Sequence, residues 1–344
     1  MTDAAPAGGT GAEPVAPIVG VVGCGVTGSR VVALLAAAGI RVVGHDVLRG
    51  NAVSSTRPRG GVVVEQLVDL VPCDAVVLCQ PAPHAEVAAL FLREGTPVVS
   101  ISDDLDDLRA LLGFSDLTRR HDAALVAGAG MAPGLSGLLA RYLVDQLAVV
   151  DELHVAIHGT AGPACARQHH QALGDTALGW HDGEWVEPPG GSGRDLVWFP
   201  EPVEAHDCYR ARLADPLLLR AVFPTASRIS ARVSATRRDR MTSRLPMLSP
   251  PHAGGDIGAV RVEARGADAD GGRVTVLAGA AGPTAQLAAA VAAATAIQLV
   301  RHGLPTGVHV LGGDSLHGLD LLHHATAAGV QVQEFTGVAR ATGW

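Results

Sequence analysis

Residues 18–46 read IVGVVGCGVTGSRVVALLAAAGIRVVGHD and contain the most informative pattern in the chain. The first five residues are rich in valine and isoleucine and predict a buried β-strand. A helix is expected from about Val26 to Ala38, because Gly39 supplies the residue type that most often ends a helix. Residues 40–43 predict a second strand. Together these elements form one strand–helix–strand unit of the ~30-residue size expected for parallel strands.

The turn between the first strand and the helix carries the pattern GxGxxG. Gly23 permits the tight turn, Gly25 lets the backbone approach a pyrophosphate, and Gly28 allows the helix to pack closely on the strand. The helix amino terminus adds free N–H groups for phosphates. In this context the pattern predicts a dinucleotide-binding loop, made of Gly23, Gly25, Val26, Thr27 and Gly28. The alternative is a glycine-rich turn that binds nothing.

An acidic residue follows at the expected place. Asp46 ends the second strand, where its carboxylate is suited to accept hydrogen bonds from ribose hydroxyl groups, and this favours NAD. NADP stays possible, because Arg49 lies three residues further on and is suited to a 2′-phosphate. Gln80 and Pro81 follow a later strand, at the edge of the sheet that faces the cofactor, and are expected on the nicotinamide side.

The rest of the chain predicts an α/β protein with two sheets. Strands alternate with helices as far as residue 127, which indicates a doubly wound parallel Rossmann sheet. After Asp151 the alternating patterns at 152–157, 228–236, 258–265 and 273–278, with a hairpin at 180–186, indicate a second α+β domain on a mostly antiparallel sheet. We expect a disordered tail (1–16), a dinucleotide-binding domain (17–135), a substrate and dimerisation domain (136–282) and a C-terminal segment (283–344) that packs back on the Rossmann domain.

Composition excludes several classes of function. The chain has 344 residues, of which 48% are apolar and 17% charged, and a formal net charge of −8, which disfavours nucleic acid as a partner. All 26 basic residues are arginine, so no lysine is available for acid–base or Schiff-base chemistry. Five cysteines without a CxxC pair fit a reducing cytoplasm better than a disulfide framework. The apolar run at 287–297 is shorter than the roughly 20 residues that span a bilayer, and predicts a buried helix.

Two further segments support a family resemblance. GTPVVSISDD (95–104) and VAGAGMAPGLSGLLAR (126–141), together with the glycine loop, resemble the saccharopine dehydrogenase/reductase-like superfamily. The resemblance implies hydride transfer at a carbon bonded to nitrogen, on an amino acid, imine or polyamine-like substrate. Saccharopine-forming dehydrogenases of that kind use a Lys/His pair, which a chain without lysine cannot supply. Related sugar oxidoreductases carry Glu-Lys-Pro where this chain has Ser-Ile-Ser-Asp-Asp (100–104), which disfavours that family.

The segment 159–170 is the richest in chemical groups outside the glycine loop. If Pro163 begins a helix, Cys165 and His169 lie on one face, with Cys165 in the first turn where the helix dipole lowers a thiol pKa. His169 or His170 is the expected proton donor to a nascent amine. The alternative is a helix whose polar face carries two histidines. A zinc site built from Cys165, His169, His206 and Cys208 is a further alternative, but the spacings match no known zinc module, so we assign no metal.

Substrate binding is expected from arginines and an aromatic residue. Arg167, Arg237 and Arg238 are suited to hold a carboxylate through bidentate hydrogen bonds, and Trp198 belongs to an aromatic-rich region that is suited to wall a pocket. The alternative for Arg237 and Arg238 is a solvated charged turn, and the alternative for the aromatic region is the local core of a small sheet. The sequence thus predicts a homodimeric NAD(P)-dependent oxidoreductase acting on a C–N bond. A dinucleotide sensor or scaffold without turnover, or a transferase that uses NAD transiently, remain open.

Overall fold

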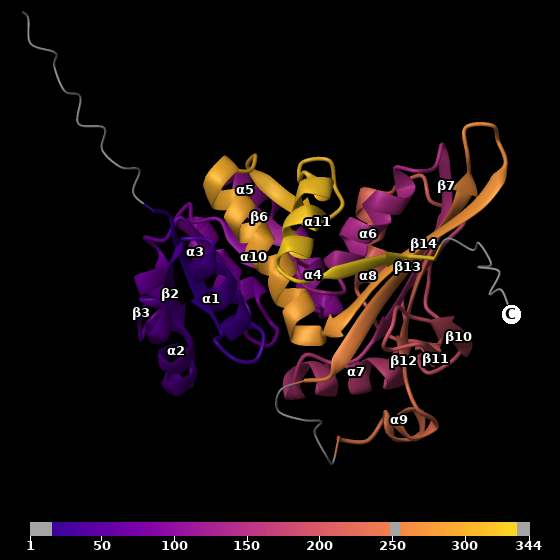
Figure 1. Cartoon of the computed structure of the whole chain (residues 1–344), viewed down its shortest axis with the longest axis horizontal. Coiled ribbons are helices and arrows are strands. Elements are labelled where there is room, and N and C mark those ends of the chain that lie inside the picture. The colour runs from indigo at the N-terminus through magenta and orange to yellow at the C-terminus, as the bar shows by residue number, and fades with distance from the viewer. Residues whose placement is uncertain (1–15, 248–254, 336–344) are drawn as a thin grey trace, which may run out of the picture.

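The computed structural model describes residues 16–247 and 255–335, and the expected N-terminal tail lies almost wholly outside them. Two sheets lie side by side, with helix α10 between them (Figure 1). This is the α/β architecture with a Rossmann sheet and a second α+β sheet that the sequence predicts. All five cysteines are free.

The first sheet has seven parallel strands in the order β15-β6-β5-β4-β1-β2-β3. Its strands are β1 (Ile18–Val22), β2 (Arg41–His45), β3 (Val62–Val63), β4 (Ala75–Leu78), β5 (Val98–Ser100), β6 (Ala124–Ala127) and β15 (Gly307–Val310). The chain adds β2 and β3 on one side of β1 and then crosses to add β4, β5 and β6 on the other side. The strand order therefore reverses between β1 and β4. Ligands bind at such a switch point, outside the carboxyl ends of the strands.

Helices cover both faces of this sheet. One face packs against α1 (Gly28–Ala37) and α10 (Thr284–His302), and the other against α3 (Ala85–Arg93), α4 (Leu105–Leu112) and α5 (Ser115–Arg120). Helix α2 (Arg49–Thr56) and two short 3-10 helices (Arg57–Arg59 and Leu67–Leu70) lie in the connections. Strands β1, β4 and β6 are apolar along their whole length because both of their faces are covered.

The second sheet has nine strands, and its main path is β10-β11-β12-β7-β13-β14-β16. They are β7 (Val149–His158), β8 (Gly179–His181), β9 (Glu184–Val186), β10 (Asp195–Trp198), β11 (Ala205–Arg210), β12 (Arg228–Ser234), β13 (Ile257–Ala267), β14 (Arg273–Pro283) and β16 (Gln331–Glu334). Only β7 and β12 pair in parallel. Apolar residues at alternate positions of β7, β12 and β13 face the core, where they meet α6 (Leu135–Val144) and α8 (Asp215–Val222).

Helix α10 joins the two sheets into one core. It is long and apolar enough to cross a membrane by length and composition, yet 78% of it is buried inside the protein, as the sequence predicts for a buried helix. The chain beyond α10 divides between the two sheets. Strand β15 completes the Rossmann sheet, whereas α11 (Gly318–Ala327) leads to β16, which pairs with β14.

Two local differences from the sequence-based expectation have clear causes. The strand expected at 228–236 ends at Ser234, and the arginine cluster after it forms helix α9 (Arg237–Thr242). The Thr236 and Asp239 side chains form a reciprocal capping box that starts this helix. Helix α4 begins two residues later than expected, because the Asp104 side chain accepts hydrogen bonds from the N–H groups of Asp106 and Asp107 and so marks the N-cap.

Candidate active site

The glycine loop between β1 and α1 is held by its own backbone. Gly23 has φ +85°, and its N–H donates to the His45 carbonyl at 2.8 Å. A Cβ at Gly23 would lie 2.4 Å from the Gln80 nitrogen, and one at Gly28 would lie 1.8 Å from the Gly23 oxygen. A Cβ at Gly25 would meet nothing within 4 Å. Gly23 and Gly28 are therefore required by the protein itself, whereas Gly25 faces open space.

Asp46 lies beside this loop. Its carboxylate accepts hydrogen bonds from the backbone N–H groups of Cys24 and Leu48, both at 2.7 Å. Arg49, in contrast, forms an exposed ion pair with Glu65. The carboxylate is thus fixed next to the glycine loop, and the arginine is engaged at the surface.

A cavity of about 640 Å³ joins the glycine loop to helix α7 (Pro163–Gly174) of the second domain. Its walls come from the glycine loop, the ends of β4 and β5, the segment 130–133, the first turns of α7 and the start of α10. It is large enough for a cofactor and a small substrate. The predicted site residues that line it are Gly25, Val26, Thr27, Gln80, Pro81, Arg167 and His169.

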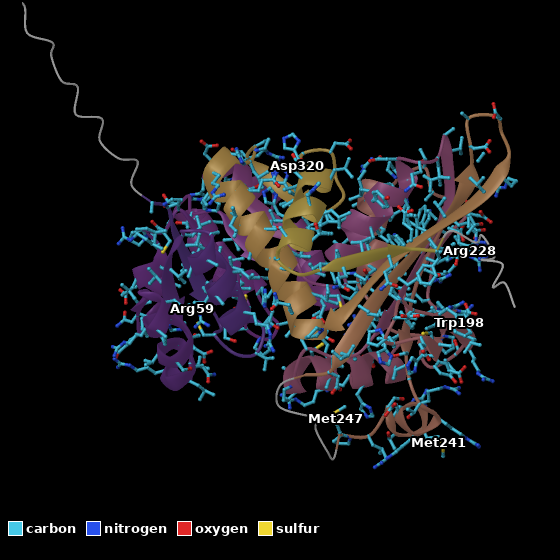
Figure 2. The ribbon with its side chains drawn as sticks, viewed as in Figure 1. Arg59, Trp198, Arg228, Met241, Met247 and Asp320 are labelled. Atoms are coloured by element: carbon cyan, nitrogen blue, oxygen red, sulfur yellow. The ribbon has the colours of Figure 1, made fainter. Side chains whose placement is uncertain are left out.

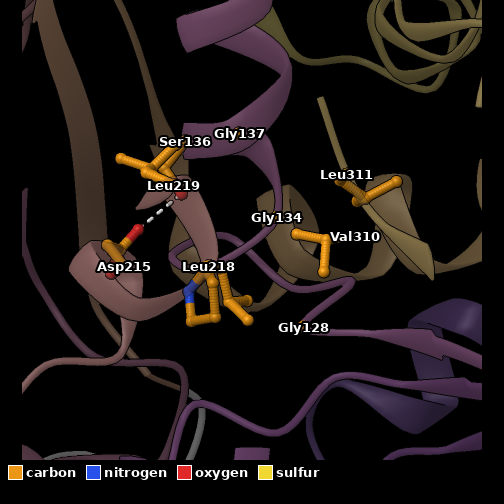
Figure 3. A pocket seen from close by; sticks show the side chains of 10 residues that line it. Gly128, Gly134, Ser136, Gly137, Asp215, Leu218, Leu219, Val310 and Leu311 are labelled. Atoms are coloured by element: carbon orange, nitrogen blue, oxygen red, sulfur yellow. Dashed lines mark hydrogen bonds between the residues drawn. The ribbon is translucent and has the colours of Figure 1, made fainter. Parts of the chain in front are cut away.

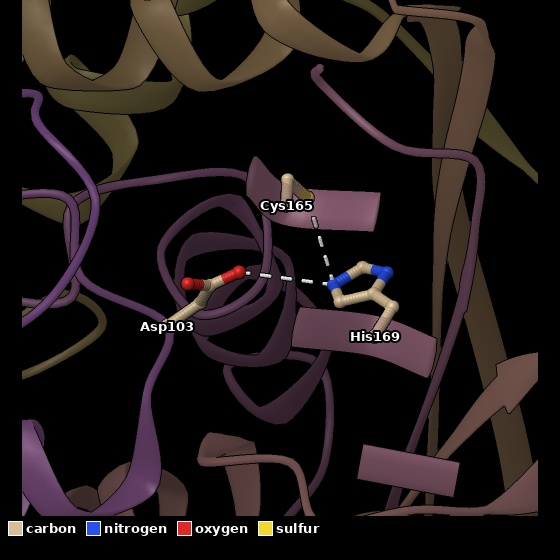
Figure 4. Close-up of side chains that lie close together, drawn as sticks. All are labelled: Asp103, Cys165 and His169. Carbon is tan, nitrogen blue, oxygen red and sulfur yellow. Dashed lines mark hydrogen bonds and ion pairs between the residues drawn. The ribbon is translucent and has the colours of Figure 1, made fainter. Parts of the chain in front are cut away.

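Three polar side chains meet at the α7 wall, and we call them the histidine cluster (Figure 4). His169 Nε2 lies 3.7 Å from a carboxylate oxygen of Asp103 and 3.8 Å from the Cys165 sulfur. Cys165 and His169 are on one face of α7, as their spacing predicts, and Asp103 follows β5. Their ligating atoms all lie within 4.8 Å of one another.

The charges of this cluster favour a protonated imidazole. Burial by itself lowers the pKa of a histidine, and His169 is only 8% exposed. The neighbouring Cys165 and the Asp103 carboxylate act against burial and raise the pKa of His169 well above its usual value. Both neighbours therefore favour the charged form of an imidazole that borders the cavity.

A buried histidine fixes the loop that carries Gln80. His84 Nε2 lies 2.7 Å from the Gln80 carbonyl and Nδ1 lies 2.8 Å from the Ser100 hydroxyl. Burial lowers the pKa of His84. Because a carbonyl can only accept, Nε2 carries the proton of the neutral ring and Nδ1 accepts from Ser100. Among the described residues the side-chain amide of Gln80 has no partner and borders the cavity.

A second buried acid lies behind the cluster, at the start of α8. Asp215 is 1% exposed and accepts a hydrogen bond of 2.6 Å from the Ser136 hydroxyl, beside a void of about 10 Å³ (Figure 3). Its other carboxyl oxygen has no partner among the described residues. Burial raises the pKa of Asp215 to about 6, with a further increase from Asp103 and an opposing effect of His169. Its protonation is thus coupled to the histidine cluster.

The structure places the remaining predicted residues elsewhere. His170 Nε2 lies 2.9 Å and 3.1 Å from the carbonyl oxygens of Thr242 and Leu245, so this histidine anchors the segment after α9. Arg237 and Arg238 are exposed on α9 and do not line the cavity. Their predicted role in substrate binding is therefore not supported by a position at this cavity.

Trp198 and two of the four residues considered for zinc also lie away from the cavity. Trp198 is 60% exposed on β10, on the outer part of the second domain (Figure 2). His206 and Cys208 are on β11, where His206 stacks against His158. They do not join Cys165 and His169, whose third neighbour is Asp103.

The sequence-based reasoning missed the part that Asp103 plays. Its position before a helix suggests an acid at the helix amino terminus, but Asp104 takes that place. The available signal was its location: Asp103 follows a parallel strand at the edge where ligands bind. His84 was missed as well, because a single histidine in a helix turn has no pattern.

Comparison with known proteins supports the fold. No family model and no curated protein sequence matches this chain. Among solved structures, saccharopine dehydrogenase (L-Glu forming) from Saccharomyces cerevisiae aligns with a TM-score of 0.70 at 15% identity, covering 93% of this chain and 100% of that one. A meso-DAPDH variant from Clostridium tetani E88 aligns with a TM-score of 0.50 at 12% identity, covering 85% and 93%. The chain therefore has a saccharopine dehydrogenase-like fold, as its motifs predict.

Proposed function

We propose that this protein is an NAD(P)-dependent oxidoreductase that acts on a C–N bond of an amino acid or imine-type substrate bearing a carboxylate. One observation carries the proposal: a dinucleotide-type glycine loop and a proton-holding histidine cluster line the same cavity. Binding and proton transfer can therefore take place within reach of each other. The saccharopine dehydrogenase-like fold supports the choice of an amino acid substrate.

The residues present fit a dinucleotide. Gly25 leaves open space on the cavity side, which a pyrophosphate would fill, and the amino terminus of α1 faces the same loop. The fixed carboxylate of Asp46 is suited to ribose hydroxyl groups and would repel a 2′-phosphate. Arg49 is paired with Glu65 at the surface. We therefore propose NAD as the preferred cofactor.

The proposed chemistry divides between cofactor and protein. In the reducing direction the reduced cofactor supplies a hydride to the carbon of a C=N bond. His169 donates the proton that the nitrogen gains, and returns to its charged form from solvent. Asp103 orients the imidazole and stabilises its charge. Arg167, the arginine among the cavity-lining residues, would hold the substrate carboxylate.

The two alternatives are distinguished by turnover. A sensor or scaffold needs no proton donor in the cavity, so the presence of the histidine cluster favours an enzyme. A transferase that uses NAD transiently would use the same cavity and the same acid, but it would consume no cofactor overall. Net oxidation of NADH indicates a reductase, whereas turnover of substrate without net oxidation of NADH indicates a transferase.

The first experiment is a fluorescence titration with NADH and NADPH. We expect saturable binding of one of them, weakened by about 100-fold in Gly25→Val, at a position where an added Cβ meets nothing within 4 Å. Circular dichroism and the unfolding temperature of the variant control for folding. A screen of amino acids with NAD, and of imines with NADH, then identifies the substrate. If neither cofactor binds at millimolar concentration, the oxidoreductase proposal is wrong.

A further inference from the structure

We propose that Asp103, Cys165 and His169 form a zinc-binding site, and that zinc bound there inhibits the enzyme. The site is neither the set of four residues considered from the sequence nor a requirement of the proposed chemistry. The inhibition, but not the metal binding, rests on the proposed function, because zinc would occupy the nitrogen that delivers the proton.

Two of the three separations between ligand atoms are close to those of a zinc centre, and the three atoms all lie within 4.8 Å of one another. With Zn–S of about 2.3 Å and Zn–N and Zn–O of about 2.0–2.1 Å, tetrahedral angles place N and S about 3.6 Å apart and N and O about 3.3 Å apart. The observed separations are 3.8 Å between His169 Nε2 and the Cys165 sulfur, and 3.7 Å between Nε2 and Asp103. Small side-chain rotations would bring the three atoms onto one metal ion.

The donor set suits zinc in chemistry as well as in geometry. Zinc prefers thiolate, imidazole and carboxylate ligands, and all three types are present once each. A thiolate and a carboxylate also neutralise the two charges of the ion. Mg²⁺ and Ca²⁺ prefer oxygen ligands throughout, so a site with sulfur and nitrogen discriminates against them.

The fold brings the ligands together from one helix and one connection. Cys165 and His169 are four residues apart on one face of α7, and Asp103 lies between β5 and the capped start of α4. All three side chains border the cavity of about 640 Å³. A metal ion can therefore enter through the cavity, and the fourth coordination position faces it.

The remaining features of the cluster fit this assignment. Cys165 neither gives nor takes the proton in the proposed transfer, where its contribution is limited to its effect on the pKa of His169. His169 is a buried residue whose Nε2 meets both other ligands, which places all three on one side of the ring. Cys79 borders the same cavity but does not belong to the group of three, and it provides a matched control.

The test uses the full chain without a polyhistidine tag, treated with a chelator and then dialysed. Calorimetry with zinc chloride is expected to give one site per chain. Titration with Co²⁺ is expected to give a thiolate-to-cobalt charge-transfer band in the near ultraviolet. Because removing a direct ligand costs at least as much as removing an outer partner, Cys165→Ser and Asp103→Asn should each weaken zinc binding by about 100-fold or more. Cys79→Ser should leave the affinity unchanged.

The outcomes separate the two proposals. Zinc binding that persists in Cys165→Ser, or no binding of zinc at micromolar concentration, would overturn the site. Stoichiometric binding with the cobalt band, combined with zinc inhibition of NADH oxidation that a chelator reverses, supports it. If NADH does not bind but zinc does, the proposed function fails and the metal site stands. Activation by zinc would contradict the inhibitory role.

Discussion

The glycine-loop wall of the cavity is fixed by backbone contacts, whereas the α7 wall is fixed by side chains. On the first wall, added carbon atoms at Gly23 and Gly28 would collide with neighbouring backbone. On the second wall, Asp103, Cys165 and His169 meet through their functional groups, from two separate elements. The first wall therefore depends on close backbone contacts within the Rossmann domain and suits binding. The second depends on side chains from both domains and suits chemistry.

The largest effect is expected on the α7 wall. His169→Asn removes the proposed proton donor and should lower the turnover rate by about 10²–10⁴-fold, the range typical of general acid–base catalysis. Binding of NADH should stay within a factor of about two, equivalent to about 0.4 kcal/mol, because the glycine loop forms the opposite wall of the cavity. Steady-state rates and a fluorescence titration on the same preparation test both statements.

The neighbouring histidine is the matched control. His170→Asn removes a side chain that bonds to carbonyl groups of Thr242 and Leu245, outside the histidine cluster. It should lower the unfolding temperature and affect turnover far less than His169→Asn does. Equal losses of turnover in the two variants would show that His169 has no special part in the chemistry.

A smaller effect is expected on the glycine-loop wall. Gly25→Val fills the open space where a pyrophosphate would lie and should weaken NADH binding by about 100-fold, equivalent to about 2.7 kcal/mol. The unfolding temperature should change little, because an added Cβ at this position meets no protein atom within 4 Å. Gly23→Ala, which collides with the Gln80 backbone, should instead destabilise the fold. Unaltered NADH affinity in Gly25→Val contradicts the assignment of this wall.

The two walls also differ in how well the sequence predicts them. The glycine pattern, Asp46 and the surrounding strands are local, so their spacing is enough to place them. Asp103 and His169 come together only after two domains pack, and no spacing rule connects them. The same reason explains the omission of β15, whose four residues, Gly307–Val310, show no strong pattern and are placed by pairing with β6. Helix α9 was not predicted. The arginine cluster is consistent with a charged turn, but the capping box of Thr236 and Asp239 starts a helix there.

Cofactor preference offers a finer test of the first wall. Asp46→Asn removes the charge that would repel a 2′-phosphate, while it keeps the size of the side chain. The ratio of NADPH to NADH affinity should rise by about tenfold, equivalent to about 1.4 kcal/mol. Parallel titrations with both cofactors measure the ratio. A preference for NADPH in the unmodified protein would show that Asp46 does not set the selectivity.

The pH dependence tests the electrostatics of the second wall. The reducing reaction needs protonated His169, so its rate should be constant at low pH and fall as pH rises through the raised pKa of this residue. The oxidising reaction should show the opposite dependence. Because the Asp103 carboxylate helps to raise this pKa, Asp103→Asn should move the falling limb to lower pH. Rate profiles recorded with a chelator present, so that no metal occupies His169, measure the shift; an unmoved limb would exclude Asp103 as its cause.

The last effect is expected behind the α7 wall, at Asp215, and concerns stability rather than activity. Burial raises the pKa of Asp215 from 3.8 to about 6, so the folded state binds the proton more tightly than the unfolded chain. The stabilising contribution of the protonated acid is complete below pH 3.8 and is lost as pH rises to about 6.

Asp215→Asn stays neutral throughout. The difference in unfolding free energy, variant minus unmodified protein, should therefore increase by roughly 1–3 kcal/mol over that interval. Above pH 6 the difference should stay level. Denaturant unfolding of both proteins at a series of pH values measures this difference, and a difference independent of pH would mean that Asp215 keeps an ordinary pKa in the folded protein. The charged form is then tolerated behind the α7 wall, where the negative charge of Asp215 adds to the groups that favour the proton on His169.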